Sequence, residues 1–191
     1  MMDQIDERRL RLGLAWVADD PPTAAARLSA TFGAAIPADR AVSIGGLVVI
    51  VRGPASVEAV DRLHVVERDD APTIAAWLGP LAVGWATVDT DRAAEELTAA
   101  GIIDPPGVPV ERFAVLGASG LRSDDSAFGV PVVLLEPLEE GRLAATLARH
   151  GEGPCAVVIG PPDGGPAGLV AGGPVSGPHL LVHGGGYHRG R

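Results

Sequence analysis

The segment HLLVHGGGYHRGR, residues 179–191, contains the closest match in this sequence to a catalytic motif. One group of lipases and esterases builds its oxyanion hole from an apolar run followed by His-Gly-Gly-Gly. In those enzymes the motif follows an early strand and precedes a Gly-x-Ser-x-Gly turn that carries the nucleophile. No serine in this sequence lies in such a turn, and eight residues follow His183. We therefore do not expect ester hydrolysis.

Carboxylates are the next candidates for chemistry, because a positioned Asp or Glu can act as a general acid or base. Asp124 follows Arg122 in the segment LRSDDSAFG, and Glu111 opens an apolar run. The Asp124–Asp125 pair is also typical of a turn in which the carboxylates bind local amides. Glu111 and Asp124 are the candidate catalytic residues, and the sequence gives Glu111 no partner.

Metal and thiol chemistry are poorly supported. His179 and His183 are four residues apart, which on one strand separates them by roughly 13 Å, too far for one metal ion. His183 and His188 are joined by glycines, which hold ligands poorly, so we expect a solvated tail. Cys155 is the one cysteine. It excludes an internal disulfide and a cysteine-based zinc site, and its apolar surroundings predict a buried structural residue.

Composition excludes several classes of protein. The formal net charge of −9 and the pI near 4.9 argue against a nucleic-acid partner, which needs a basic surface. The apolar runs are too short to cross a membrane, and the charged start MMDQIDERRLRL lacks a signal-peptide core. We therefore expect a cytoplasmic protein of ordinary domain size.

An internal repeat indicates which elements position these residues. A shift of 69 positions places LGLAWVADDPPTAAARLSAT (12–31) on LAVGWATVDTDRAAEELTAA (81–100). The informative identities are Trp16 with Trp85, Asp20 with Asp89, and Leu28 with Leu97. Each copy predicts a strand, an Asp that caps the next helix, and then further strands. Copy one is the shorter of the two.

The apolar periodicity predicts the remaining elements. Helices are expected at 22–32, 91–100 and 138–151, with Glu139 and Glu140 as helix-start charges, and helical candidates lie at 56–63 and 71–78. Strands are expected at 42–51, 110–117, 130–137, 155–160, 168–171 and 179–183. The stretch 151–178 is rich in Gly and Pro and predicts turns.

The segment AFGVPVVLLEPLEEGRLAATLARHGEGPCAVVIG resembles the vicinal oxygen chelate superfamily, which includes glyoxalases, bleomycin-resistance proteins and methylmalonyl-CoA epimerases. Members often carry Phe-Gly-Asn-Pro-Ile-Glu-Leu-Leu-Glu-Pro here, and the epimerases continue with a helix and Gly-Glu-Gly. The matching residues are Phe128, Gly129, Pro131, Leu134, Leu135, Glu136, Pro137 and 151–153. The resemblance covers about 12–160 and implies βαβββ modules paired in a half-open barrel.

The resemblance also implies positions for metal ligands, and this sequence departs from them. A His near the start of each first strand would fall near Gly13 and Ala82, and the Glu of a last strand is Val133. The equivalent in copy one is Val49 or Ile50. These residues offer no side-chain N, O or S donor. We therefore expect no metal and no cofactor, which puts glyoxalase, epimerase and dioxygenase chemistry in doubt.

Strand alternation predicts a face of small residues where the family holds its metal. That face carries Gly13, Ala15, Ala82, Gly84 and Ala86, with Val133 beside them. Small apolar residues on a concave sheet leave room for a hydrophobic ligand, so these six form the predicted ligand pocket. The alternative is that the face is packed against a neighbouring layer. Trp16 and Trp85 lie on the opposite face and are expected in the core.

Together these patterns predict an α+β fold: two tandem βαβββ-type modules forming one curved glyoxalase-like sheet, with a short β-rich Gly/Pro extension. The expected divisions are 1–80, 81–153 and 154–191. The expected function is metal-independent binding of a hydrophobic organic metabolite in resistance, transport or biosynthesis. Two alternatives stay open: a lyase, isomerase or cyclase that uses carboxylates on a small metabolite or acyl-CoA, and a non-catalytic structural or regulatory module. Both a homodimer and a closed monomer are compatible with two modules per chain.

Overall fold

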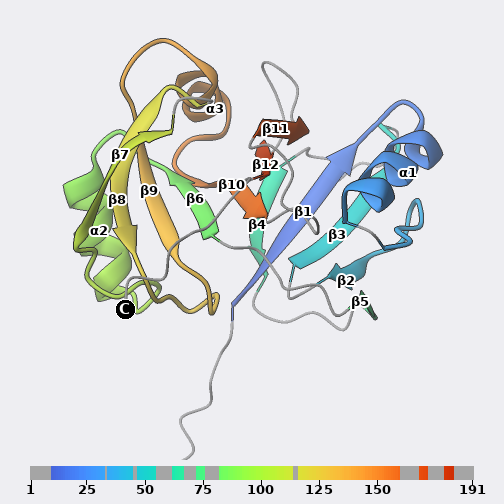
Figure 1. The fold of residues 1–191 in the computed structure, drawn as a ribbon, viewed down its shortest axis with the longest axis horizontal. Coiled ribbons are helices and arrows are strands. Elements are labelled where there is room, and N and C mark those ends of the chain that lie inside the picture. Colours follow the sequence, from blue (N-terminus) through green and yellow to red (C-terminus); the bar gives the residue numbers. More distant parts are fainter. Residues whose placement is uncertain are drawn as a thin grey trace, which may run out of the picture.

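The computed structural model describes residues 10–32, 34–44, 47–54, 62–66, 72–75, 82–113, 116–159, 168–171 and 179–182. These residues form three helices and twelve strands arranged in two sheets (Figure 1). The prediction of a mixed α+β protein is confirmed. None of the described helices is both long and apolar enough to span a membrane.

The five-stranded sheet contains the first copy of the repeat, in the order β4-β1-β3-β2-β5. Its elements are β1 (Arg11–Val17), α1 (Pro21–Phe32), β2 (Val42–Ile44), β3 (Leu47–Arg52), β4 (Arg62–Val66) and β5 (Thr73–Ala75). Within the β1-α1-β2-β3 segment the first strand, β1, is parallel to the last strand, β3, and β2 is antiparallel to β3. The outer position beside β2 is filled from later in the chain by the short strand β5.

The second copy forms one end of the seven-stranded sheet, whose order is β11-β12-β10-β6-β9-β8-β7. Its elements are β6 (Ala82–Ala86), α2 (Thr90–Ala99), β7 (Val108–Phe113), β8 (Ala118–Ser123) and β9 (Val132–Pro137). Here again the first strand, β6, is parallel to the last strand, β9. The copy is a complete strand-helix-three-strand unit.

The C-terminal strands complete this second sheet. After α3 (Arg142–His150) the chain forms β10 (Gly153–Ile159), β11 (Gly168–Ala171) and β12 (His179–Val182). β10 pairs with the free edge of β6 in antiparallel fashion, β12 is parallel to β10, and β11 is antiparallel to β12. The order β10-β12-β11 therefore mirrors β6-β9-β8 about the β6–β10 pair.

The two copies do not share one curved sheet in the described residues, which differs from the sequence-based expectation. The free edge of β1 is occupied by β4, which follows β3 after a short connection, and the free edge of β6 is occupied by β10. Strands close in sequence tend to pair, so each copy takes its edge partner from the segment that follows it. β4 and β10 lie against each other where the two sheets meet.

One hydrophobic core joins the two sheets. Leu14, Val49 and Leu134 are among its fully buried members, and Phe32 of α1 and Leu97 of α2 belong to the same cluster. Trp16 and Trp85 pack against this cluster, as expected from the alternation of β1 and β6. Because one cluster contains residues of both copies, neither copy buries its helix-bearing face alone.

Three local expectations need correction, and a fourth is largely untested. The 42–51 run forms two antiparallel strands, β2 and β3, and the expected strand at 110–117 is interrupted by a turn at 116–117. The helix proposed at 71–78 is strand β5 at its described positions, since Thr73 pairs with Ser43. The helix proposed at 56–63 lies outside the described residues except for 62–63, which begin β4.

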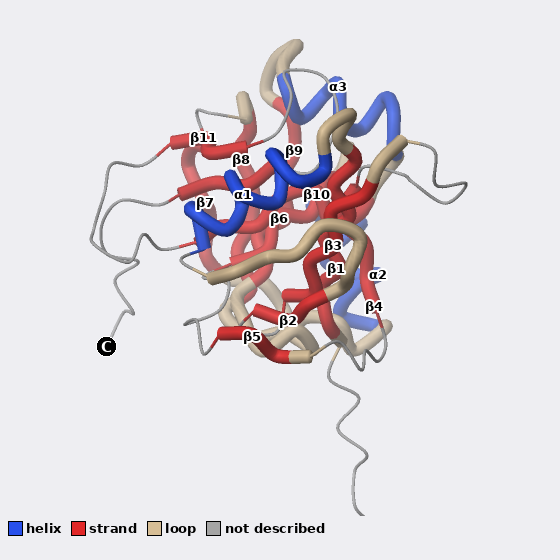
Figure 2. Tube along the Cα trace, turned by 90° about the vertical axis from the view of Figure 1, so that its right-hand side faces the viewer, coloured by secondary structure: helices blue, strands red, loops and turns tan. Residues whose placement is uncertain are grey.

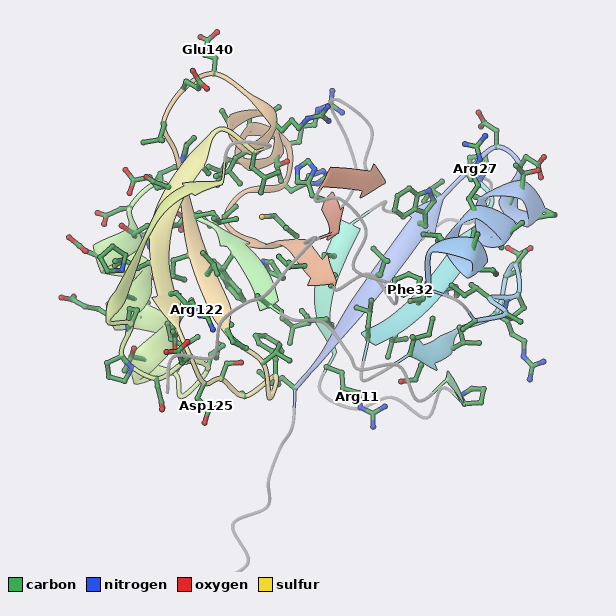
Figure 3. All side chains as sticks on the ribbon, in the orientation of Figure 1. Arg11, Arg27, Phe32, Arg122, Asp125 and Glu140 are labelled. Atoms are coloured by element: carbon green, nitrogen blue, oxygen red, sulfur yellow. The ribbon has the colours of Figure 1, made fainter. Side chains whose placement is uncertain are left out.

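The last helix is shorter than expected at its start. Glu139 and Glu140 precede α3, which begins at Arg142 after Gly141. Figure 3 shows Glu140 projecting away from the molecule in the loop between β9 and α3. Gly141 is the N-cap residue and has an extended backbone, so the helix begins only after it and the acidic pair stays in the loop.

Candidate functional site

The predicted ligand face of the second copy is packed. Ala82, Ala86 and Val133 have no solvent exposure, and they belong to a second hydrophobic cluster with Leu143 of α3. A Cβ on Gly84 would lie 2.8 Å from Leu135 Cδ1 and 2.9 Å from Ala156 Cβ. Both distances are shorter than real Cβ contacts, so the small residue here makes close packing possible and leaves no space beside it.

The equivalent face of the first copy is less enclosed. The pairing of Ala15 with Ile50 corresponds to the pairing of Gly84 with Val133, which identifies Ile50 as the equivalent of Val133. Gly13 is buried, and both Ala15 and Ile50 are half-buried. None of the six predicted pocket residues lines the pocket described below. Ligand binding at either face stays a prediction, and at the second copy it would require α3 to move.

A metal does not fit the positions that the family resemblance assigns to its ligands. Gly13, Ala82, Ile50 and Val133 supply no side-chain donor atom. Across the part of the chain that the structure describes, no three His, Cys, Asp or Glu side chains gather closely enough to hold a metal ion.

The two candidate catalytic carboxylates lie at different strands of the seven-stranded sheet. Asp124 lies in an exposed turn after β8, where its Oδ1 is 2.7 Å from Arg122 Nε. Asp125 Oδ1 accepts a hydrogen bond from the Ser126 amide, which is the turn geometry expected from the sequence. Figure 3 shows Arg122 and Asp125 at the same end of the seven-stranded sheet. Glu111 belongs to β7 at the edge of that sheet, and its side chain lies outside the described residues. A catalytic role for either carboxylate stays a prediction.

Two glutamates that carry the family resemblance bind the start of α2. Glu136 Oε2 accepts from the Thr90 amide and hydroxyl, both at 3.3 Å. Glu152 Oε1 accepts from the Val88 amide at 2.8 Å and from Thr87 Oγ1 at 2.9 Å. The Glu136 bonds satisfy an orphan donor in the first turn of α2, where negative charge is favoured, and the Glu152 bonds hold the residues just before the N-cap.

Arg92 completes this cluster. Its guanidinium lies 2.6 Å from Glu152 and 2.8 Å from Glu96. The Val88 amide and the Arg92 guanidinium lower the pKa of Glu152, and the two glutamates raise the pKa of Arg92. The Glu152 carboxylate therefore stays ionised at neutral pH and serves to link the start of β10 to the start of α2.

A buried histidine lies beneath α3. His179 pairs with Ala156 of β10, and its Nε2 is 2.9 Å from Thr146 Oγ1. The Thr146 hydroxyl donates to the Arg142 carbonyl, so it accepts its second bond from a protonated Nε2. Within the part of the chain that the structure describes, the buried Nδ1 has no hydrogen-bond partner, which favours the neutral ring with its proton on Nε2. Burial, and secondly the charge of Arg142, lower the pKa of His179.

Cys155 is not an activated nucleophile. It lies in the same hydrophobic cluster as Leu143, and burial raises the pKa of its thiol to about 12. A protonated thiol in apolar surroundings is inert, because the thiolate is the reactive form. The expectation of a buried structural cysteine is confirmed.

The structure has a pocket beside α1 that the sequence patterns did not predict. It has a volume of about 870 Å³ and lies between α1, the connection 35–40, β2 and Pro72. Figure 2 turns the α1 side of the molecule towards the viewer, with β2 and β5 below the helix. One wall is a stripe of small residues on α1, and the other is apolar loop and strand. The lining residues are Pro22, Ala25, Ala26, Ser29, Ala35, Ile36, Pro37, Ala38, Arg40, Val42 and Pro72.

The polar groups of this pocket are few. The Ser29 hydroxyl donates to the Ala25 carbonyl at 2.7 Å and accepts from the Ile36 amide at 2.8 Å. This pair of bonds joins the helix to the loop and uses the hydroxyl within the protein. Arg40 is the charged residue of the lining. A helical stripe of small residues was the available sequence signal, but in an alanine-rich chain that signal does not distinguish a pocket wall from a packed surface.

Comparison with known proteins does not establish a family for this chain. No family model matches the sequence, and no curated protein matches it. Among solved structures, a hypothetical protein from Bacillus halodurans C-125 is 18% identical, with a TM-score of 0.35 over 42% of this chain and 56% of its own. A methylmalonyl-CoA epimerase variant from Streptomyces coelicolor, bound to 2-nitronate-propionyl-CoA, is 25% identical, with a TM-score of 0.34 over 42% of this chain and 60% of its own.

A third structure, TioX from Micromonospora sp. ML1, is 17% identical and has a TM-score of 0.27. The match covers 67% of this chain and 98% of TioX. The match to the epimerase and to the Bacillus protein spans less than two thirds of those chains. Because all three TM-scores lie below 0.5, strand order rather than these similarities must support any family assignment.

Proposed function

We propose that this chain is a glyoxalase-like protein that binds a small apolar organic molecule in the pocket beside α1. The fold part of this proposal is supported by strand order. The second copy has the succession β6-α2-β7-β8-β9 and the order β6-β9-β8-β7, with first and last strands parallel. That arrangement is the βαβββ module of the family that the sequence resembles.

Within this proposal the module of the second copy pairs with the C-terminal strands. β10, β12 and β11 repeat the first, last and third strands of a module on the other side of the β6–β10 pair. The first copy is then a shortened module that carries the pocket. Of the proposed divisions, 80/81 lies between β5 and β6, whereas 153/154 lies within β10, after α3 has ended at His150.

The observation that carries the functional proposal is the apolar pocket of about 870 Å³. Ligand pockets of small molecules commonly have volumes of about 300–1,000 Å³ and mostly apolar walls. The small residues of the second copy are buried in one cluster with Leu143 of α3, so a ligand that binds without rearrangement needs another site. Asp124 lies at the end of β8 and Glu111 on β7, both in the other sheet. This separation favours binding over carboxylate catalysis.

The test is a titration with N-phenyl-1-naphthylamine, an uncharged apolar probe that fluoresces when it leaves water. We expect saturable binding to the wild-type chain. Ala26→Trp places an indole in the pocket from an exposed position of α1, and we expect it to weaken binding about tenfold or more. Ala30→Trp is the matched control, because Ala30 is exposed on the same helix outside the pocket lining.

The proposal is wrong if the wild-type chain does not bind the probe, or if Ala26→Trp binds it as tightly as Ala30→Trp. Circular dichroism of both variants checks that α1 is retained. Catalysis would be supported instead if an acyl-CoA or another small metabolite were turned over and Asp124→Asn abolished the turnover.

A further inference from the structure

We infer that Arg40 makes the pocket beside α1 selective for organic anions, that is, for ligands with an apolar body and one acidic head group. This inference rests on the proposed function and specifies its ligand class. The observation behind it is the composition of the pocket lining. Apolar or small residues form the walls, and Arg40 is the one charged residue among them.

Arg40 is held in place by an unusual turn. Asp39, directly before it, has φ 57°, and it is the one non-glycine residue with positive φ in the described part of the chain. The Asp39 amide donates to the Val51 carbonyl at 2.7 Å, and Ala38 forms a β-bridge with Val51. The turn is therefore fixed to β3, and the residue that follows it emerges at the pocket. Backbone conformations of this kind often occur where a structure positions a functional group.

The guanidinium of Arg40 is available to a ligand. Among the residues that the structure describes, Arg92 and Arg122 form ion pairs, whereas Arg40 forms no ion pair or hydrogen bond. Its side chain is exposed, so it can turn towards a ligand at low cost. A guanidinium presents parallel N–H donors that match a carboxylate, sulfonate or phosphate.

The rest of the pocket discriminates against neutral polar ligands. The Ser29 hydroxyl is engaged by Ala25 and Ile36, so burying a ligand hydroxyl or amide there would cost free energy without a compensating bond. An acidic group at the edge pairs with Arg40 while the apolar body occupies the walls. The net charge of −9 repels anions in general, so the attraction must come from this local cation.

The experiment compares two probes that differ by one acidic group. 8-Anilino-1-naphthalenesulfonate is N-phenyl-1-naphthylamine with an added sulfonate. For the wild-type chain we expect the sulfonate probe to bind about two- to fivefold more tightly than the neutral one, the range of an exposed ion pair. Arg40→Gln should remove this difference between the two probes. Arg149→Gln, an exposed change on α3, is the control.

A second arm replaces the sulfonate with a carboxylate. Decanoate should displace the neutral probe at a lower concentration than 1-decanol does from the wild-type chain, and at the same concentration from Arg40→Gln. If the neutral probe binds but neither anion has an advantage, or if Arg40→Gln keeps the advantage, the anion inference is overturned and the proposed pocket remains. If the neutral probe does not bind, the proposed function itself fails.

Discussion

At the scale of single residues, we expect the ionisation of His179 to change the stability of the fold near neutral pH. Burial lowers its pKa below the ordinary value of 6.5, so the native ring stays neutral where the unfolded ring takes up a proton. The free energy of unfolding is then highest above pH 6.5 and decreases as the pH falls below it. Urea denaturation between pH 8 and pH 5 measures this slope.

His179→Gln is the informative variant, because its amide can still donate to Thr146 but does not titrate in this range. We expect a smaller loss of stability below pH 6.5 than in the wild-type chain. Glu152 does not contribute to this slope. Its pKa is lowered from the ordinary value of 4.5, so the stabilisation that its carboxylate provides is lost only at pH values below 4.5. An unchanged slope in His179→Gln would show that another group dominates.

Gly84 tests whether the predicted ligand face is packed or open. Its missing Cβ would meet Leu135 and Ala156 at less than 3.0 Å, so Gly84→Ala should lower the free energy of unfolding by about 1–3 kcal/mol. Gly107→Ala is the matched control, because nothing lies within 4 Å of its added Cβ. The measurement is a comparison of the melting temperatures of the two variants. If Gly84→Ala is as stable as Gly107→Ala, the face has room for a ligand after all.

At the scale of elements, an N-cap bond stabilises the start of α2. Asp89 Oδ1 accepts from the Arg92 amide at 3.0 Å, which is an N-cap bond. Asp89→Ala should lower the free energy of unfolding by about 1 kcal/mol, while Asp89→Asn, which keeps a capping oxygen, should lose much less. Urea midpoints of the two variants provide the measurement, and equal midpoints would mean that Glu136 and Glu152 hold the helix without the cap.

The elements that could be predicted from sequence are those with strong local signals. The Trp, Asp and Leu register located β1, α1, β6 and α2, because caps and helical periodicity act within a few residues. β8 (118–123) was not predicted, because its glycine and polar residues do not resemble a strand. Gly120 is required there, since a Cβ would collide with the Leu134 carbonyl oxygen. That requirement comes from a partner strand, which local patterns do not contain.

At the scale of the whole molecule, partners on sheet edges could not be predicted. Nothing in β10 or β12 specifies that they extend the sheet of the second copy, because backbone hydrogen bonds at an edge are the same for any strand. The pocket beside α1 could not be predicted either, because it depends on how the connection 35–40 and Pro72 lie against the helix in space. The small residues of β6 were recognised correctly as unusual, but their neighbour in space is α3, which their own spacing does not reveal.

The shared core predicts that the two sheets unfold together. Leu14 of the first sheet and Leu134 of the second belong to one buried cluster and are 1% and 0% exposed. Leu14→Ala and Leu134→Ala should each lower the free energy of unfolding by about 2–5 kcal/mol, because each leaves a cavity in that cluster. Calorimetry should show one transition in the wild-type chain and in both variants.

Native-state hydrogen exchange extends this test to individual strands. If the sheets form one cooperative unit, Leu14→Ala should reduce the protection of β6 and β9 amides as much as that of β1 and β3 amides. Leu134→Ala should show the reciprocal effect. Independent sheets would behave differently: each substitution would reduce protection only in its own sheet, and calorimetry would resolve two transitions. That result would mean that the contact between β4 and β10, together with the joint core, contributes little to stability, and that the pocket-bearing sheet folds alone.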